Sequence, residues 1–319
     1  YEISCSLVGS EMCIRDSHFG VEAVLKREIQ ALGYEITKVE DGRVTFEGDS
    51  LAVCRANIFL RTAERVMVQA ARFQAVTYDQ LFESVKALDW AKYIPEDGKF
   101  WVKKAGSIKS KLFSPSDIQR IVKKAIVEKL KTEYHTNWFQ EDGAEYPIRV
   151  FFYKDEAIIA LDSTGESLHK RGYRTYTAKA PISETLAAAL IMLTPWKKDR
   201  ILIDPFCGCG TFPIEAAMIA ADIAPGMNRA FTAESWTNFI PKKNWYEAVR
   251  EANDRINDEI DVDIQGFDID ETMVEYSRKN AVNAGVEHLI HFQTRPLEKL
   301  SHSKKYCLLY TSPSPRDCS

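Results

Sequence analysis

The 319-residue sequence lacks any run near the roughly 18 apolar residues that a membrane-spanning helix needs, and it has no collagen-like or heptad repeat. Apolar residues make up 45% and charged residues 28% of the chain, as in globular proteins. These features exclude membrane, fibrous and wholly disordered proteins. The net charge is only −4, so a nucleic-acid-binding surface has to be a local patch. A length prior of about 150 residues per domain predicts roughly two domains.

Cysteine is scarce inside the chain, because four of the seven residues lie near its ends: Cys5, Cys13, Cys307 and Cys318. Residues 1–16 have no sustained apolar core, so no signal peptide supports a secreted, disulfide-linked protein. The strings at 10–17 and 307–317 resemble translated sequencing-linker read-through. We therefore expect residues 1–17 and 307–319 to be non-native tails; ordinary variable termini are the alternative.

The first unit, residues 18–75, reads as a small α+β domain. Apolar residues at helical spacing predict a helix that ends at Gly33, followed by a strand pair at 34–39 and 43–46. A helix at 51–57 and a strand at 63–71 complete the unit. The first helix needs a sheet whose first strand precedes Gly20. The tail-like segment occupies that position, so we expect a native strand to be missing.

The second unit runs from about residue 77 to 162. The pattern predicts a helix at 78–88, a strand at 99–104, an amphipathic helix at 116–130 and a hairpin over 148–161. The stretch 99–131 holds ten Lys or Arg residues and two acids.

The third unit starts near residue 179 and alternates helices with short apolar strands. We expect helices at 183–193, 214–221 and 271–284 and strands at 201–204, 262–267 and 289–293. This alternation predicts an α/β fold with a parallel sheet.

The strongest motif joins a strand to a helix through two glycines. It comprises Asp204, Pro205, Phe206, Cys207, Gly208, Cys209, Gly210 and Thr211. Glycines allow close backbone approach to a ligand, and the helix start offers free N–H groups. Pro213 replaces the third glycine of a dinucleotide motif, and the Gly-Lys-Ser/Thr of a P-loop is absent. The acid at 204 suits a cationic ligand, the aminopropyl ammonium of S-adenosylmethionine; a tight turn without a ligand is the alternative.

A second acidic motif closes the next strand, with Asp268, Ile269 and Asp270. An acid at this place typically accepts hydrogen bonds from a ribose. The two motifs on adjacent strands together predict a nucleoside-containing cofactor. Cys207 and Cys209 have no second Cys or His pair at ligand spacing, so we expect no metal.

Several strings carry a resemblance to a known family. They are residues 20–28 (GVEAVLKRE), 168–174 (LHKRGYR), 180–188 (APISETLAA), the Asp204 turn and 223–229 (IAPGMNR). In combination they resemble the THUMP-domain class I RNA methyltransferases, and among these the N-terminal half of the bacterial 23S rRNA guanine-N2 methyltransferases.

The resemblance implies three domains between the two tails. They are a ferredoxin-like domain at 18–75, a THUMP RNA-binding domain at 76–165 and an incomplete, Rossmann-like methyltransferase domain at 166–306. It also implies S-adenosylmethionine as cofactor, with Glu184 and Thr185 at its methionine end. The implied reaction is methyl transfer to an exocyclic base amine, N2 of guanine in 23S rRNA, in the cytoplasm. The implied partner is that rRNA before or during subunit assembly, with no membrane and no metal.

The chain departs from the family at two places. The family's catalytic Asn-Pro-Pro-Tyr motif follows the fourth strand, shortly after a position like Tyr306, and no such tetrapeptide occurs here. We therefore assign no catalytic residue and expect a C-terminally truncated, inactive chain. Pro296 stands where many class I methyltransferases place an adenine-binding acid.

Eight cations are candidates for RNA binding: Lys103, Lys104, Lys109, Lys111, Lys123, Lys124, Arg171 and Arg174. Lysines neutralise phosphates, and Trp101 and Phe113 are able to stack on bases or to pack. A solvated helix face and a flexible basic linker are the alternatives. Two other functions compete with RNA methylation: adenine-N6 methylation of DNA, and RNA binding without catalysis.

Overall fold

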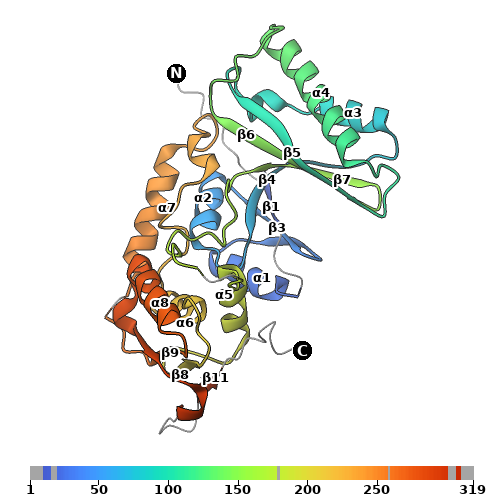
Figure 1. Cartoon of the computed structure of the whole chain (residues 1–319). Helices are drawn as coiled ribbons and strands as arrows, with labels where there is room; N and C mark the ends of the chain where they lie inside the picture. The colour runs from blue at the N-terminus through green and yellow to red at the C-terminus, as the bar shows by residue number, and fades with distance from the viewer. Residues whose placement is uncertain (1–9, 16–19, 178–179, 258, 301–306, 310–319) are drawn as a thin grey trace.

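The computed structural model describes residues 10–15, 20–177, 180–257, 259–300 and 307–309; in the first and last of these segments only the backbone is described. The chain builds two sheets. A large sheet from the N-terminal half lies in the upper part of Figure 1, and a smaller one from the C-terminal third lies at the bottom. Among the described residues, no helix combines the length and apolar character needed to cross a bilayer.

The larger sheet has seven strands in the order β2-β3-β1-β4-β7-β6-β5. The first half of its chain comprises β1 (Ser10–Arg15), α1 (Glu22–Ala31), β2 (Ile36–Glu40), β3 (Arg43–Gly48), α2 (Ser50–Phe59) and β4 (Arg65–Gln74). The second half comprises α3 (Tyr78–Lys86), β5 (Lys99–Ile108), α4 (Pro115–Tyr134), β6 (Glu145–Tyr153) and β7 (Glu156–Asp162). All neighbours are antiparallel except β5 and β6.

A strand precedes Gly20, and it is formed by residues of the tail-like segment itself, so the expected gap in the sheet is filled while the absence of a native strand stays a prediction. The backbone of β1 lies between β3 and β4 and pairs with both, Cys13 with Thr45 on one side and with Met67 on the other. The two flanking strands offer backbone donors and acceptors that need a partner between them, and any extended backbone satisfies this need. A segment set aside for its sequence thus occupies a central place in the sheet.

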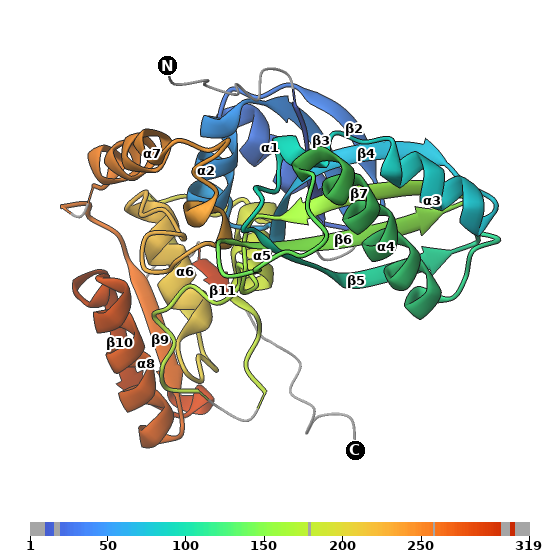
Figure 2. The ribbon, with the colours of Figure 1, turned by 90° about the horizontal axis from the view of Figure 1, so that it is seen from above.

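The two N-terminal units share one sheet because β4 pairs with β7, from Met67 opposite Asp162 to Gln74 opposite Glu156. Helices α3 and α4 pack against the β5–β7 end, as Figure 2 shows from above. The predicted apolar stripe of α4 is buried, Ile118, Val122 and Leu130 among its residues. The sequence pattern therefore predicted the packed face of this helix correctly.

The smaller sheet is parallel, with the order β10-β9-β8-β11, as the alternation of helices and strands predicted. Its elements are α5 (Glu184–Leu193), β8 (Ile201–Asp204), α6 (Thr211–Ala220), β9 (Ile264–Asp268), α8 (Glu271–Ala284), β10 (Ile290–Thr294) and β11 (Cys307–Leu309). In the part of the chain that the structure describes, short 3-10 helices also occur at Trp90–Lys92, Thr232–Ser235, Glu287–Leu289 and Leu297–Lys299. The backbone of β11 pairs with β8, although residues 307–319 were set aside as a tail.

An unpredicted helix, α7 (Lys242–Arg255), ties the two halves of the molecule together. It lies against α2 (Figure 1), where Arg55 Nε donates to a Glu251 carboxylate oxygen at 2.7 Å. In the segment before α7, the Trp236 ring stacks on Tyr146 of β6 with ring centroids 5.4 Å apart. These contacts fix the smaller sheet against the larger one.

Candidate active site

The turn between β8 and α6 lies at the carboxyl end of its strand, where open α/β sheets bind ligands. Its backbone takes left-handed conformations at Gly208 (φ 52°) and Gly210 (φ 86°). A Cβ at Gly210 would lie 2.8 Å from the Ser277 Cβ. Glycine is therefore required at position 210 both by conformation and by space.

The acidic motif after β9 holds this turn in place. Asp268 accepts a hydrogen bond from Gly208 N–H at 2.9 Å, and Cys207 N–H donates to the Phe267 carbonyl at 2.8 Å. The two motifs found separately in the sequence thus form one edge of the smaller sheet. We call it the cofactor edge, after the ligand expected there. The side chains of Phe206 and Ile269 project from it, 50% and 76% exposed, and offer apolar surface for a flat ring.

Asp204 is the most deeply placed acid of this edge, at 3% exposure. Its carboxylate accepts a hydrogen bond from Phe206 N–H at 3.1 Å. Burial, with a smaller contribution from the Asp268 charge, raises the pKa of Asp204 to about 7. Within the described residues, no Lys, Arg or His forms an ion pair with it. A buried carboxyl without a cation fits a positively charged ligand.

The start of α5 supplies Glu184 beside this edge. Its carboxylate receives the Arg174 Nη2 at 2.8 Å, and Arg174 Nη1 also lies 3.3 Å from the Thr211 hydroxyl. Burial raises the pKa of Glu184 to about 7, although the charge of Arg174 lowers it. Thr185, which was paired with Glu184 as a cofactor contact, is placed differently. Its buried hydroxyl donates to Glu64, so it is not presented to the cofactor edge.

The thiols of the turn face inward. Cys207 and Cys209 are buried, and burial raises the pKa of the Cys207 thiol well above its usual range. They therefore supply backbone to the edge. Among the described residues, no group of three His, Cys, Asp or Glu side chains is arranged to hold a metal ion.

Of the eight RNA-binding candidates, Arg171 is contradicted by the structure. It is 2% exposed, donates to the Leu168 and Arg61 carbonyls, and lies 3.5 Å from Glu215. A guanidinium enclosed in this way has no face left for an RNA phosphate. Arg174 is also turned inward, to the Glu184 carboxylate and the cofactor edge.

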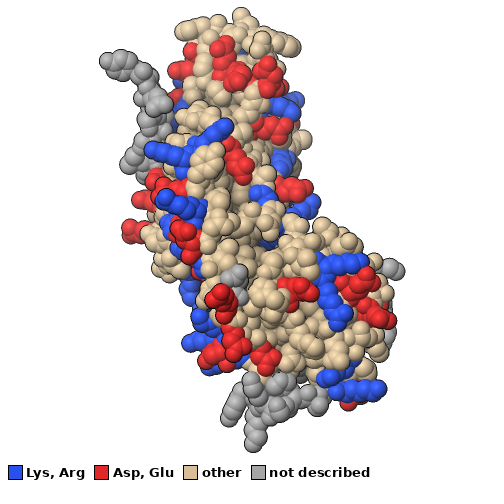
Figure 3. Space-filling view, turned by 90° about the vertical axis from the view of Figure 1, so that its left-hand side faces the viewer, with Lys and Arg blue, Asp and Glu red and all other residues tan. Residues whose placement is uncertain are grey.

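The six lysines differ in their surroundings. Lys123 of α4 lies 3.7 Å from the centre of the Phe100 ring and 3.2 Å from a Glu141 oxygen. Lys124 of the same helix is exposed, as are Lys109 and Lys111 in the turn after β5. On the face drawn in Figure 3, blue and red side chains alternate, and no broad basic area appears.

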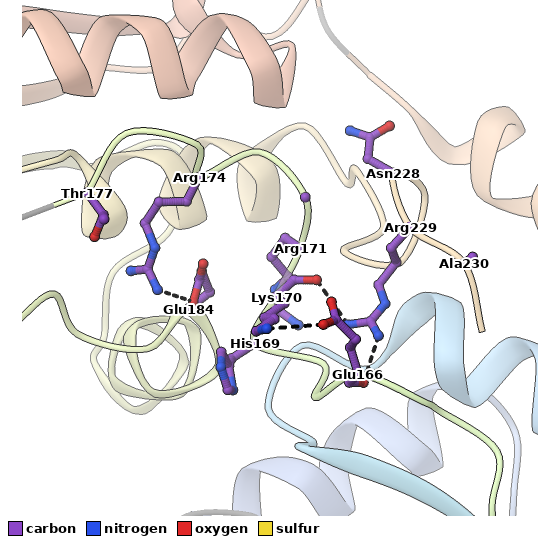
Figure 4. A pocket seen from close by; sticks show the side chains of 11 residues that line it. Glu166, His169, Lys170, Arg171, Arg174, Thr177, Glu184, Asn228, Arg229 and Ala230 are labelled. Carbon is purple, nitrogen blue, oxygen red and sulfur yellow. Dashed lines mark hydrogen bonds and ion pairs between the residues drawn. The ribbon is translucent and has the colours of Figure 1, made fainter. Parts of the chain in front are cut away.

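Sequence reasoning missed a pocket of about 680 Å³ beside the cofactor edge. Figure 4 shows Arg174 and Glu184 at one end of it and Glu166 and Arg229 at the other. Further lining residues are His169, Lys170, Arg171, Gly172, Thr177, Asn228 and Ala230. The pocket joins segments that are 44 or more residues apart, from Glu166–Glu184 to Asn228–Ala230, so no local signal marks it. The strings at 168–174 and 223–229, which carried the family resemblance, contribute several of its lining residues, but the sequence did not indicate that they lie together.

Three family models match successive parts of the chain. The "RlmL ferredoxin-like domain" matches residues 13–67, the "THUMP domain" 75–162, and the "RMKL-like, methyltransferase domain" 171–313. A curated relative from Bacillus subtilis (strain 168), "Putative RNA methyltransferase YpsC", is 48% identical over 302 residues. The match covers 94% of this chain and 78% of that protein.

Two solved structures are similar throughout. One, titled as a "predicted N6-adenine-specific DNA methylase" from Listeria monocytogenes str. 4b F2365, is 43% identical, with a TM-score of 0.90 over 94% of this chain and 78% of that one. The other, SMU.472, is a complex with SAH; it is 40% identical, with a TM-score of 0.88 over 94% of this chain and 79% of that one.

Proposed function

Since the chain belongs to the family of methyltransferases built from an RlmL ferredoxin-like, a THUMP and an RMKL-like methyltransferase domain, we propose that it methylates N2 of guanine in 23S rRNA. The coarser activity, an RNA methyltransferase that uses S-adenosylmethionine, follows from the family and its SAH-bound member. The observation that supports the cofactor site in this chain is the buried Asp204 carboxyl at the glycine turn, which has no cation partner among the described residues.

The cofactor supplies an electrophilic methyl group bound to a sulfonium. Asp204 would hold its ammonium group, and Asp268 its ribose hydroxyls. The backbone from Cys207 to Thr211 would take the methionine end, together with Glu184. Phe206 and Ile269 would cover the adenine ring. Each role matches the chemistry of the residue: carboxylates accept hydrogen bonds from cations and hydroxyls, and exposed apolar side chains pack on rings.

The target base has to leave its stack to reach this edge, because its amine is otherwise covered by its neighbours. In the family, Asn-Pro-Pro-Tyr residues orient that amine, and the 319 residues contain no such tetrapeptide. We therefore assign cofactor and RNA binding to the residues present and no acid–base step to any of them. Most of the rate enhancement would then come from alignment of amine and methyl group.

Tritium transfer from labelled S-adenosylmethionine to unmodified 23S rRNA tests the proposal. We expect transfer by a version extended with a family-like segment that carries Asn-Pro-Pro-Tyr, and none by the 319 residues alone. The label should be found in N2-methylguanine after nuclease digestion. Label in another nucleotide would contradict the guanine-N2 assignment. Turnover by the 319 residues would contradict the role given to the tetrapeptide. We place the reaction in the cytoplasm, where the rRNA is assembled.

The Listeria structure's title keeps adenine-N6 methylation of DNA as a second candidate. The THUMP match over residues 75–162 favours RNA. It covers strands β5, β6 and β7 of the larger sheet, which lie outside the cofactor edge. The same assay with double-stranded DNA discriminates between the two. Transfer to DNA adenine without transfer to rRNA would establish the second candidate in place of the first.

A further inference from the structure

Two cations, Lys103 of β5 and Arg229 in the loop after α6, have no carboxylate oxygen within hydrogen-bonding distance among the described residues. Lys103 lies beside Asp162, which is fully buried. One Asp162 oxygen is shared by Arg65 Nη1 at 2.8 Å, Arg149 Nε at 2.9 Å and Lys103 Nζ at 3.8 Å. Because the two arginines hold the close positions, Lys103 is left with a long contact.

Lys103 is therefore the cation of this group that is available to a ligand. Its other polar contact is the Gly165 carbonyl at 3.4 Å, and its side chain is 35% exposed. Arg65 donates to the same carbonyl at 2.7 Å. Burial lowers the pKa of Lys103; the Asp162 charge opposes this shift, and the neighbouring Arg65 and Arg149 charges add to it. An anion that came to Lys103 would relieve this repulsion.

Arg229 occupies a similar position immediately beyond Gly165, in the wall of the pocket (Figure 4). Its Nη atoms donate to three backbone carbonyls, those of Glu166, Ser167 and Lys170. Within the described residues, no carboxylate forms an ion pair with it, and its Nε has no hydrogen-bond partner. Burial lowers its pKa to about 10, which still leaves it charged at neutral pH.

The pocket connects Arg229 with the cofactor edge, whereas Lys103 is not among its lining residues. Its lining runs from Arg229 past Lys170 to Arg174 and Glu184. Lys170 is exposed and lies 3.1 Å from Glu166. At about 680 Å³ the pocket exceeds the lower bound of roughly 300 Å³ for small-molecule sites, so one nucleotide fits.

We propose that Lys103 and Arg229 bind backbone phosphates of the RNA strand that carries the target base, and that the pocket between Arg229 and Glu184 receives the target nucleotide. This inference rests on the proposed function. It differs from the sequence prediction, because it selects Lys103 from the six lysines and adds Arg229. RNA is favoured over DNA because Lys103 belongs to β5, within the stretch that matches the THUMP model.

The test is fluorescence anisotropy of a labelled RNA hairpin with a single-stranded extension, titrated with the full chain at several salt concentrations. K103Q is the cleanest variant, since it removes only the two long contacts. R229Q is the second test variant. The matched control is K198Q, an exposed lysine in the turn before β8, at the sheet edge opposite the glycine turn. Calorimetry with S-adenosylmethionine confirms that each variant keeps its methyltransferase domain folded.

We expect K103Q and R229Q each to weaken binding about tenfold, as for loss of a charge-assisted hydrogen bond. Each should also reduce the slope of log affinity against log salt by about 0.7, the value for one phosphate contact with a single strand. K198Q should change neither quantity, and all variants should bind the cofactor like the parent chain.

Parent and K103Q chains with the same affinity and slope would overturn the proposal. So would an R229Q chain that keeps full RNA affinity, or a K198Q control that loses as much. A DNA hairpin of the same sequence that binds equally and responds equally would overturn the assignment to RNA. If the parent chain binds the cofactor but no RNA, the proposed function fails as well.

Discussion

Replacing Asp204 with Asn should stabilise the protein at alkaline pH while it weakens cofactor binding. The Asp204 carboxyl is almost completely buried, and burial with the nearby Asp268 charge moves its pKa from the ordinary 3.8 to about 7. A displacement of roughly three pKa units corresponds to about 4 kcal/mol, at 1.36 kcal/mol per unit. This is an upper bound on the free energy that the folded protein loses by keeping the carboxylate ionised in its interior.

The pH window follows from the direction of the shift. Below pH 3.8 the carboxyl is protonated in both folded and unfolded chains, so it costs nothing. Between 3.8 and about 7 the unfolded chain ionises first, and the folded chain progressively loses stability. Above about 7 the full cost is present. Asn is neutral throughout, so D204N should gain stability at pH 8 and show almost no gain near pH 4.

Urea unfolding at pH 4, 6 and 8 measures the stability change, and calorimetry at pH 8 measures cofactor affinity. We expect a gain in unfolding free energy of up to about 4 kcal/mol at pH 8. We also expect at least a tenfold loss of affinity for S-adenosylmethionine, because a charge-assisted hydrogen bond contributes roughly 1.5–3 kcal/mol. For the parent chain, affinity should rise from pH 6 to pH 8 as Asp204 ionises.

Two results would refute this reasoning. Unchanged cofactor affinity in D204N would remove Asp204 from the binding site. A loss of stability at pH 8 would show that the buried Asp204 carboxylate does not destabilise the folded protein. The Asp199→Asn variant, at an exposed site before β8, is the matched control and should behave like the parent chain.

Two further substitutions test the frame around the site. Gly210→Ala should lower the unfolding free energy by about 1–3 kcal/mol, since φ is 86° and the new Cβ would meet Ser277 at 2.8 Å; thermal unfolding with unchanged Tm would contradict this account of the turn. Glu215→Gln should cost about 3–5 kcal/mol in urea unfolding, because it keeps a partner for the Tyr173 hydroxyl but leaves the buried Arg171 without its carboxylate. The double change Arg171→Met and Glu215→Leu should recover much of that loss, and failure to do so would argue against the ion pair.

Local patterns were enough to predict most elements and the meeting of the two acidic motifs at one sheet edge, while the assignment of these residues to the cofactor stays a prediction. The apolar spacing of α4 predicted its buried face, and the alternation after residue 180 predicted a parallel sheet. Asp204 and Asp268 were found because each follows an apolar strand, and the carboxyl ends of parallel strands meet at one edge. The position of each aspartate at the end of a strand in the sequence therefore predicts its position at the sheet edge.

The backbone alone decides the place of one segment that its sequence had set apart. Residues 10–15 looked foreign to the rest of the chain, yet their backbone fills the gap between β3 and β4. The helix α7 was missed because its partner, α2, lies nearly two hundred residues earlier in the chain. Its amphipathic face becomes meaningful only when that partner is in place.

The sequence by itself determined the glycine turn between a strand and a helix, because strand ends, glycines and helix starts are local features with local causes; the type of each domain was implied by the family resemblance. Only the tertiary structure decided which cations are enclosed or paired by neighbouring side chains. Arg171 is enclosed by Glu215 and two carbonyls, Lys123 is held by Phe100 and Glu141, and Arg229 is left without a carboxylate among the described residues. The sequence alone gives the charge of a side chain. Whether that charge is neutralised depends on neighbours that folding brings from distant parts of the chain.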